Sequence, residues 1–287
     1  MRAVDVHQHL WPEELVALLA RRSTPPRLNG STLQLAEGRY DVDLAVHDLA
    51  ARVAKLDRYE VDVAIVSLQP TLGLGSLPSD ERDELVGAWE QGIRELVAAS
   101  GGRLVALAAG GEVDGFAGAC VGAPALLDLD GLAPLIDALV RSGGFMFVHP
   151  SGGHTPTGSP PWWPAVVDYP AQMQSAYLAW LAHGQERWPE LHVVFAILAG
   201  GGPFQLERLA SRGVDVRSAL HRNVYFDTAS YGRRALEPCI ETFGVEQLVY
   251  GSDFPVVDPA QTLHAVRGFG DSITRLVCYE NPTRLLA

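Results

Sequence analysis

Short apolar runs alternate with longer amphipathic segments along most of this chain of 287 residues. Short runs rich in Val, Leu, Phe and Ala are typical of strands buried in a parallel sheet. Eight runs fit that description, at residues 3–8, 63–68, 104–109, 122–127, 144–148, 192–197, 224–227 and 247–250. They predict eight strands spread over the full length of the chain.

The segments between these runs have the spacing of helices. In the first of them, apolar residues recur at Leu44, Val46, Leu49, Val53 and Leu56, close to the helical period. The full set covers residues 44–56, 82–98, 132–141, 172–187, 204–211, 234–243 and 260–266. Strand–helix alternation repeated in this way predicts an α/β protein with one domain over residues 1–287, a closed (β/α)8 TIM barrel. An open doubly wound sheet is the alternative.

Two longer segments interrupt the alternation. Residues 10–40 hold one short helix around residues 13–20 and then a polar stretch, and residues 150–164 indicate a long loop. Loops at the C-terminal ends of the strands build the functional site in barrel enzymes. We therefore expect both segments to shape a site, and residues 271–287 to form a final helix.

Two histidines one residue apart end the first apolar run, in Asp5-Val6-His7-Gln8-His9. Alternate residues of a strand face the same side, so the two imidazoles converge at the strand's end. Two later runs also end in a metal-binding side chain, His149 before a proline and Asp253 in Gly-Ser-Asp-Phe-Pro. Three histidines and one aspartate predict a site for one divalent metal ion, with Zn²⁺ the first choice. Core histidines and a turn-forming Asp253 are the alternative interpretation.

Ligands of these types carry a definite chemistry. Bound Zn²⁺ lowers the pKa of its water to about 7 and polarises a carbonyl or carboxylate oxygen. Asp253 would lie beside that water, where it could both ligate the metal and take the proton as a general base. The same nitrogen and oxygen ligands suit several divalent ions.

Charge and cysteine content exclude other classes of partner. A net charge of −12, from 34 acidic and 22 basic residues, argues against nucleic acid and against an anionic membrane surface. Cys120, Cys239 and Cys278 show no paired spacing, so we expect reduced thiols and a cytoplasmic protein. The first predicted strand begins at Ala3, so we expect no signal peptide. No apolar stretch approaches the roughly 20 residues of a membrane span.

Taken together, the motifs resemble those of the amidohydrolase-2 family. Asp-x-His-x-His-x-x-Pro lies near the start, Val-His-Pro midway and Gly-Ser-Asp-Phe-Pro near the end, and the similarity runs from Asp5 to about Pro282. The family groups metal-dependent hydrolases with non-oxidative decarboxylases related to aminocarboxymuconate-semialdehyde decarboxylase. The resemblance implies a distorted (β/α)8 barrel, a homodimer and one divalent metal, usually zinc. The ligands it implies are His7, His9, His149 and Asp253.

One position departs from the family pattern. The family usually has a histidine at the end of the sixth strand, followed by a Gly-rich turn and a proline. The turn is present here at residues 199–203, and aligning on it places Ile197 where the histidine belongs. That histidine normally orients or deprotonates the metal-bound water, which isoleucine cannot do. His192 falls at the opposite end of the strand. His154 in the long loop could swing in as a catalytic residue together with Asp253, and a solvated loop histidine is the alternative interpretation for His154.

Several further side chains are predicted to contact a small-molecule substrate. Trp11, Trp162, Trp163 and Tyr231 could wall an apolar pocket, although ordinary packing explains them equally well. Arg208 lies on the helix where the related decarboxylase places arginines that reach a substrate carboxylate in the neighbouring subunit. A solvated helix face is the alternative interpretation for Arg208.

The predicted function is a metal-dependent hydrolase acting on a small organic acid, lactone or cyclic amide through metal-activated water with Asp253 as base. Non-oxidative decarboxylation is the second reaction considered, and it would tolerate loss of the sixth-strand histidine better if the metal mainly holds the substrate. The alternative from another class is a catalytically impaired barrel that binds metal and a small-molecule or protein partner.

Overall fold

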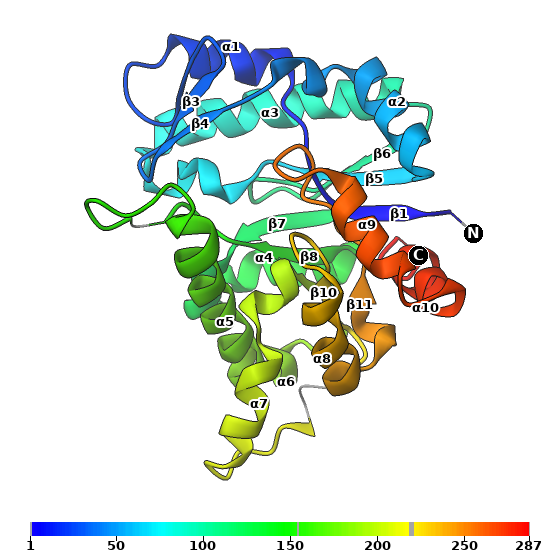
Figure 1. Cartoon of the computed structure of the whole chain (residues 1–287). Coiled ribbons are helices and arrows are strands. Elements are labelled where there is room, and N and C mark those ends of the chain that lie inside the picture. The colour runs from blue at the N-terminus through cyan, green and yellow to red at the C-terminus, as the bar shows by residue number, and fades with distance from the viewer. Residues whose placement is uncertain (1, 154, 218–220, 287) are drawn as a thin grey trace.

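The computed structural model describes residues 2–153, 155–217 and 221–286 (Figure 1). Eight of its strands are parallel and form one ring. They are β1 (Val4–His9), β5 (Val63–Ser67), β6 (Leu104–Ala106), β7 (Gly118–Gly122), β8 (Phe145–His149), β9 (Val193–Phe195), β10 (Val224–Asp227) and β11 (Leu248–Val249). Their order in the chain follows the predicted alternation.

The ring closes where two parallel sheets meet, β1-β5-β6 and β11-β10-β9-β8-β7. At one junction the Val6 amide donates to the Tyr250 carbonyl at 2.9 Å, and the His9 amide donates to the Phe254 carbonyl at 2.8 Å. At the other junction the Cys120 amide donates to the Ala108 carbonyl at 2.9 Å. The distorted (β/α)8 barrel is therefore confirmed, and the predicted metal ligands lie beside its first junction.

Helices surround the strands (Figure 1). The α-helices are α1 (Glu13–Arg21), α2 (Leu49–Tyr59), α3 (Ser79–Ala99), α4 (Leu129–Ser142), α5 (Tyr169–Ala179), α6 (Gln185–Arg187), α7 (Pro203–Ala210), α8 (Arg233–Phe243), α9 (Pro259–Arg267), α10 (Asp271–Arg275) and α11 (Asn281–Thr283). The tail is thus helical as expected. In the part of the chain that the structure describes, no helix has the length and apolar content that a membrane crossing requires.

Several predicted elements differ from the structure in their bounds, and two of them differ in kind over part of their length. The helix predicted at residues 44–56 is split into a 3-10 helix at Leu44–His47 and α2. The backbone of Asp48 is extended between them, and its side chain caps α2 by accepting from the Ala51 amide at 2.8 Å. The fourth strand, predicted at residues 122–127, ends at Gly122, and Ala123–Leu127 form a 3-10 helix. Pro124 has no amide hydrogen to donate to a sheet, which explains why the strand stops there.

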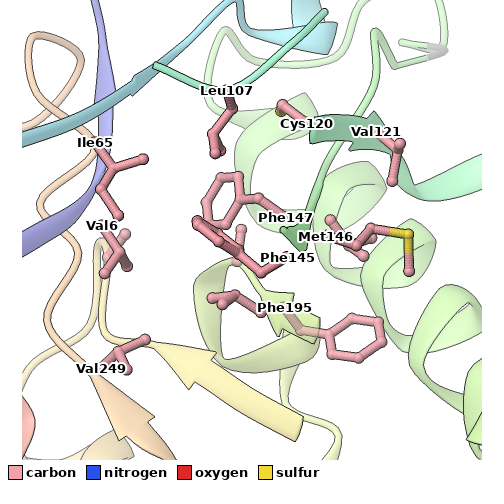
Figure 2. Close-up of a cluster of buried hydrophobic side chains, with 14 of the residues drawn as sticks. Val6, Ile65, Leu107, Cys120, Val121, Phe145, Met146, Phe147, Phe195 and Val249 are labelled. Carbon is pink, nitrogen blue, oxygen red and sulfur yellow. The ribbon is translucent and has the colours of Figure 1, made fainter. Parts of the chain in front are cut away.

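The interior of the barrel is filled by side chains. Figure 2 shows Val6, Ile65, Leu107 and Phe147, from four different parts of the ring, gathered about a common centre, and each is at most 1% exposed. A barrel of this size is a packed core and has no pore. A functional site is therefore expected at the strand ends.

A bulge in β1 sets the direction of its side chains. Asp5 pairs with Ala64 and Gln8 with Val66, so Val6 and His7 together face the single residue Ile65. Such an extra residue resets the alternation of faces. As a result Val6 belongs to the packed interior, while His7 and His9 still share one face beyond it.

The polar stretch after α1 forms a small antiparallel sheet of β2 (Arg27–Asn29), β3 (Thr32–Gln34) and β4 (Arg39–Asp41), with Leu28, Leu33 and Leu35 buried under it. Its last turn carries Glu37, whose carboxylate accepts hydrogen bonds from the Tyr169 hydroxyl and the Gly153 amide. This inserted sheet is thereby attached to the loop after β8 and to the start of α5.

Candidate metal centre

The four predicted ligands lie together at the C-terminal ends of three strands. His7 and His9 end β1, His149 ends β8, and Asp253 follows β11, with one ligand atom from each within 4.8 Å of the others. The two Nε2 atoms of His7 and His9 are 3.2 Å apart, and Asp253 Oδ1 lies 3.4 Å and 3.2 Å from them. Ligands held about 2.1 Å from one ion are separated by roughly 3.0–3.5 Å, so these spacings suit a divalent cation.

Each histidine is held through its Nδ1 atom. His7 Nδ1 lies 2.7 Å from Asp227 Oδ2, His9 Nδ1 lies 3.2 Å from the Ser67 carbonyl, and His149 Nδ1 lies 2.8 Å from the Pro150 carbonyl. An oxygen acceptor at Nδ1 requires the proton there and leaves the Nε2 lone pair free for a metal. The donor set therefore fits a metal ion by its chemistry as well as its spacing.

The charges around the cluster also favour a cation. Burial by itself would lower the pKa of His7, but Asp227 and Asp253 raise it to about 9. Burial and the neighbouring His7 charge lower the pKa of His9. For Asp253, burial acts to raise the pKa, but the three histidines bring it below the ordinary value. The carboxylates thus stabilise positive charge at the point where the ligand atoms converge.

The turn that carries Asp253 depends on a glycine. A β-carbon at Gly251 would lie 2.8 Å from His7 Cβ and 3.0 Å from Asp227 Cβ. Glycine therefore allows the chain after β11 to pass close to the first histidine. The Asp253 amide then donates to the His7 carbonyl at 2.8 Å, which fixes this aspartate beside β1.

Asp227 is a candidate site residue that is absent from the residues predicted from sequence. It ends β10, is fully buried, and accepts from the Ile197 and Ala229 amides through Oδ1, each at 2.9 Å, while Oδ2 faces His7. The available signal was the same one used for Asp253, an apolar run that ends in aspartate. Residues 224–227 are predicted above as a strand, with no role for the aspartate that ends it.

Replacement of Asp227 by asparagine is expected to weaken metal binding about 10- to 100-fold. The new amide NH2 would face His7 Nδ1, so the imidazole proton would move to Nε2 and block the ligand atom. Competition with a chromogenic chelator measures the affinity. Asp137→Asn is a matched control, because Asp137 also accepts from a ring N–H, that of Trp188 at 2.8 Å, away from the site. Equal affinity in Asp227→Asn and the parent would contradict this role for Asp227.

Ile197 lies just past the end of β9, the sixth barrel strand, at the position that the alignment indicated. It begins a turn in the left-handed region, with φ of 46° at Ile197, 51° at Leu198 and 50° at Ala199. Branched side chains rarely adopt this conformation, which costs of order 1–3 kcal/mol per residue. The side chain is 9% exposed and carries no proton to transfer.

The other predicted site residues are dispersed. Trp11 is 3% exposed, stacks on His47 and donates to Gln69 Oε1 at 2.8 Å, while Tyr231 is half-buried. Trp162 and Trp163 stack on each other, with Trp162 54% exposed. Arg208 lies on the exposed side of α7. His154 lies outside the described residues. The substrate roles of these residues stay predictions.

Tyr169 is a further residue that the sequence analysis missed. Burial is the largest cause that raises the pKa of its hydroxyl, followed by the charge of Glu37 and, more weakly, that of Asp253. Tyr169 therefore lies within electrostatic range of the metal cluster while it also binds the inserted sheet through Glu37. Neither Tyr169 nor Glu37 belongs to a motif, so their hydrogen bond could not be predicted from sequence.

Comparison with solved structures supports the fold. IDCase from Metarhizium anisopliae in its apo form superposes with a TM-score of 0.79 at 19% identity, covering 99% of this chain and 97% of that one. 5-Carboxyvanillate decarboxylase LigW from Sphingomonas paucimobilis has a TM-score of 0.76 at 17% identity, covering 99% and 98%. 2,6-Dihydroxybenzoate decarboxylase from Rhizobium has a TM-score of 0.76 at 16% identity, covering 100% and 98%.

No curated protein matches the chain. A family model described as Amidohydrolase, Amidohydro_2, matches residues 4–287. That span includes every strand of the barrel and all four residues of the metal cluster. The chain therefore belongs to this amidohydrolase family, as its motifs had indicated.

Proposed function

We propose that this protein is a metal-dependent enzyme that acts on a small organic acid, and that it cleaves a carbon–carbon bond by non-oxidative decarboxylation. The observation that carries the proposal is the convergence of three imidazoles and the Asp253 carboxylate in a centre that has Ile197 in place of a further proton-transfer group. Several solved structures that share the fold are described as decarboxylases, one of them with bound manganese.

His7, His9, His149 and Asp253 would hold the metal. A divalent cation bound there would polarise a carboxylate or carbonyl oxygen of the substrate. The histidine side chains are almost inaccessible, whereas the Asp253 side chain is 15% exposed. Asp253 is therefore the member of the cluster that can contact a substrate and exchange a proton with it.

Proton requirements favour decarboxylation over hydrolysis. When the bond to the carboxyl carbon breaks, carbon dioxide leaves and the remaining carbon keeps the electron pair and takes up one proton. Asp253, which is ionised at rest, would take that proton from solvent and pass it to the carbon. Hydrolysis needs a base that removes a proton from water and an acid that protonates the leaving group. Because the Ile197 side chain can serve neither role, a centre with Asp253 alone suits the reaction that requires a single proton transfer.

A substrate panel tests the proposal. Protein loaded separately with Zn²⁺ and Mn²⁺ is incubated with aromatic and unsaturated carboxylic acids, among them 5-carboxyvanillate and 2,6-dihydroxybenzoate, and with lactones and cyclic amides. Carbon dioxide release and ring opening are measured in parallel. The proposal expects metal-dependent release of carbon dioxide from one or more acids. Turnover confined to lactones or amides would instead establish a hydrolase. Tight metal binding without turnover of any compound would favour a catalytically impaired barrel.

Replacement of Ile197 by histidine is expected to introduce or raise lactone hydrolysis by about 10²-fold or more, the usual contribution of a general base, while decarboxylation changes little. Histidine adopts the left-handed conformation more readily than isoleucine, so the turn after β9 should be retained. Initial rates on both substrate classes give the comparison, and Ile197→Asn controls for the backbone effect. If Ile197→His raised the rate of decarboxylation as much as that of hydrolysis, the argument that a single proton transfer favours decarboxylation would be contradicted.

A further inference from the structure

Arg52 of α2 is a fully buried charged side chain next to the metal cluster. Its Nη1 donates to Gln8 Oε1 at 2.8 Å, and its Nη2 donates to the His9 carbonyl at 2.9 Å and to the Val46 carbonyl at 3.1 Å. The guanidinium also lies 4.5 Å from the centre of the Phe254 ring. All these hydrogen bonds go to uncharged acceptors, although a buried charge is costly unless another charge compensates it.

The compensating charge is Asp5, which is reached through Gln8. The Gln8 amide group donates from Nε2 to Asp5 Oδ2 at 2.8 Å and accepts from Arg52 on its other side. Asp5, Gln8 and Arg52 are each at most 2% exposed. These three residues, called here the charge relay, form a chain of hydrogen bonds between a buried carboxylate and a buried guanidinium.

Both ends of the charge relay hold the backbone that carries metal ligands. Asp5 Oδ1 accepts from the His7 amide at 3.2 Å and from the Ser252 amide at 3.0 Å, one residue before Asp253. Arg52 binds the carbonyl of His9 and stacks on the residue after Asp253. Gln8 lies between His7 and His9, so ordinary alternation directs it away from the face that they share. The bulge between Asp5 and Gln8 resets the alternation and lets the Asp5 side chain meet that of Gln8.

We propose that the charge relay is a positioning device for the metal site, and that Arg52 and Asp5 together hold His7, His9 and Asp253 at the spacing that a divalent ion requires. Metal ligands need placement to within about 0.5 Å, and hydrogen bonds that orient them contribute strongly to affinity. The inference rests on the proposed metal site but does not depend on which reaction the site performs.

Arg52→Lys and Asp5→Asn test the relay. Lysine keeps the charge but cannot reach the amide and two carbonyls with one planar group. Asparagine keeps the shape of Asp5 and one acceptor oxygen for the His7 and Ser252 amides, but it removes the charge and replaces the oxygen that accepts from Gln8 by an NH2 group. Affinity for Zn²⁺ is measured by chelator competition, the geometry of the site by the visible spectrum of the Co²⁺-loaded protein, and the fold by circular dichroism. Arg103→Met is the control, because Arg103 also binds two main-chain carbonyls, those of Val61 and Asp62, at the opposite ends of the strands.

We expect both variants to retain the barrel, to bind Zn²⁺ about 10- to 100-fold more weakly than the parent and to show an altered Co²⁺ spectrum. Arg103→Met should bind Zn²⁺ as tightly as the parent does. Parent affinity and an unchanged spectrum in either Arg52→Lys or Asp5→Asn would overturn the inference, and so would a parent that binds neither metal. The affinity for the metal is measured in the absence of substrate, so it does not depend on turnover. A parent that binds metal but turns over no compound would therefore defeat the proposed function and leave the relay standing.

Discussion

The double substitution of His7 and His9 by alanine is expected to reduce the metal content from about one equivalent to a small fraction of one. The variant removes two of the three Nε2 donors that meet at the ends of β1 and β8, so only His149 and Asp253 remain. Two ligands do not hold a divalent ion against dialysis, because the structural and catalytic sites known for Zn²⁺ use at least three protein ligands. Elemental mass spectrometry on protein freed of chelator and reloaded with Zn²⁺ or Mn²⁺ gives the content directly.

His192→Ala is the matched control for that experiment. His192 precedes β9, so it lies at the opposite end of the barrel from the cluster, and its ring packs near Tyr225. Its removal should leave the metal content unchanged. Equal metal content in the double variant and in the parent would show that the ion binds elsewhere, and the metal-dependent enzyme proposal would then be withdrawn.

The second large effect is expected for Asp253→Asn, which should lower kcat by about 10²- to 10⁴-fold on whichever acid the parent decarboxylates. Asparagine retains an oxygen that can face the metal but cannot hold and release the proton that the reaction consumes. Asp253 has a φ of 61°, a left-handed conformation that asparagine tolerates and alanine does not. The asparagine variant therefore tests the chemistry with little disturbance of the turn.

Steady-state kinetics and metal content together separate the two roles of Asp253. A fall in kcat with most of the metal retained supports proton transfer by this side chain, whereas loss of the metal itself would show that Asp253 acts mainly as a ligand. Asp258→Asn is the control, because Asp258 caps α9 a few residues later and asparagine is an equally good helix cap. A variant with parent kcat and full metal content would refute the assignment of Asp253 as the proton donor.

Much of the site could be predicted from sequence because the relevant signals are local. An apolar run that ends in histidine or aspartate places that side chain at the end of a strand, and the period of two places His7 and His9 on one face. Parallel strands bring their C-terminal ends to one side of a barrel, which unites the cluster without further information. The presence of Ile197 in place of the sixth-strand histidine could also be read from the sequence, since the Gly-rich turn after it marks the end of the strand.

Other parts of the centre depend on contacts between residues that are far apart in the chain. Asp227 and His7 meet only because β10 and β1 belong to one closed ring, and their pairing over 220 positions leaves no local pattern. The hydrogen bonds from Arg52 to Gln8 and from Tyr169 to Glu37 also join residues that are distant in the chain and leave no local pattern. Local composition did not show the bulge in β1, because a bulge is a mismatch of register between two strands and exists only once they pair.

The sequence by itself therefore determined which side chains stand at the strand ends and what chemistry they can perform, because strand period and residue type are local properties. Tertiary structure alone decided how those side chains are oriented, which charges balance theirs and which hydrogen bonds position them. The Nδ1 partners of His7 and His9, and the Asp227 carboxylate that also accepts from the Ile197 amide, come from other strands, which barrel closure brings within hydrogen-bond range.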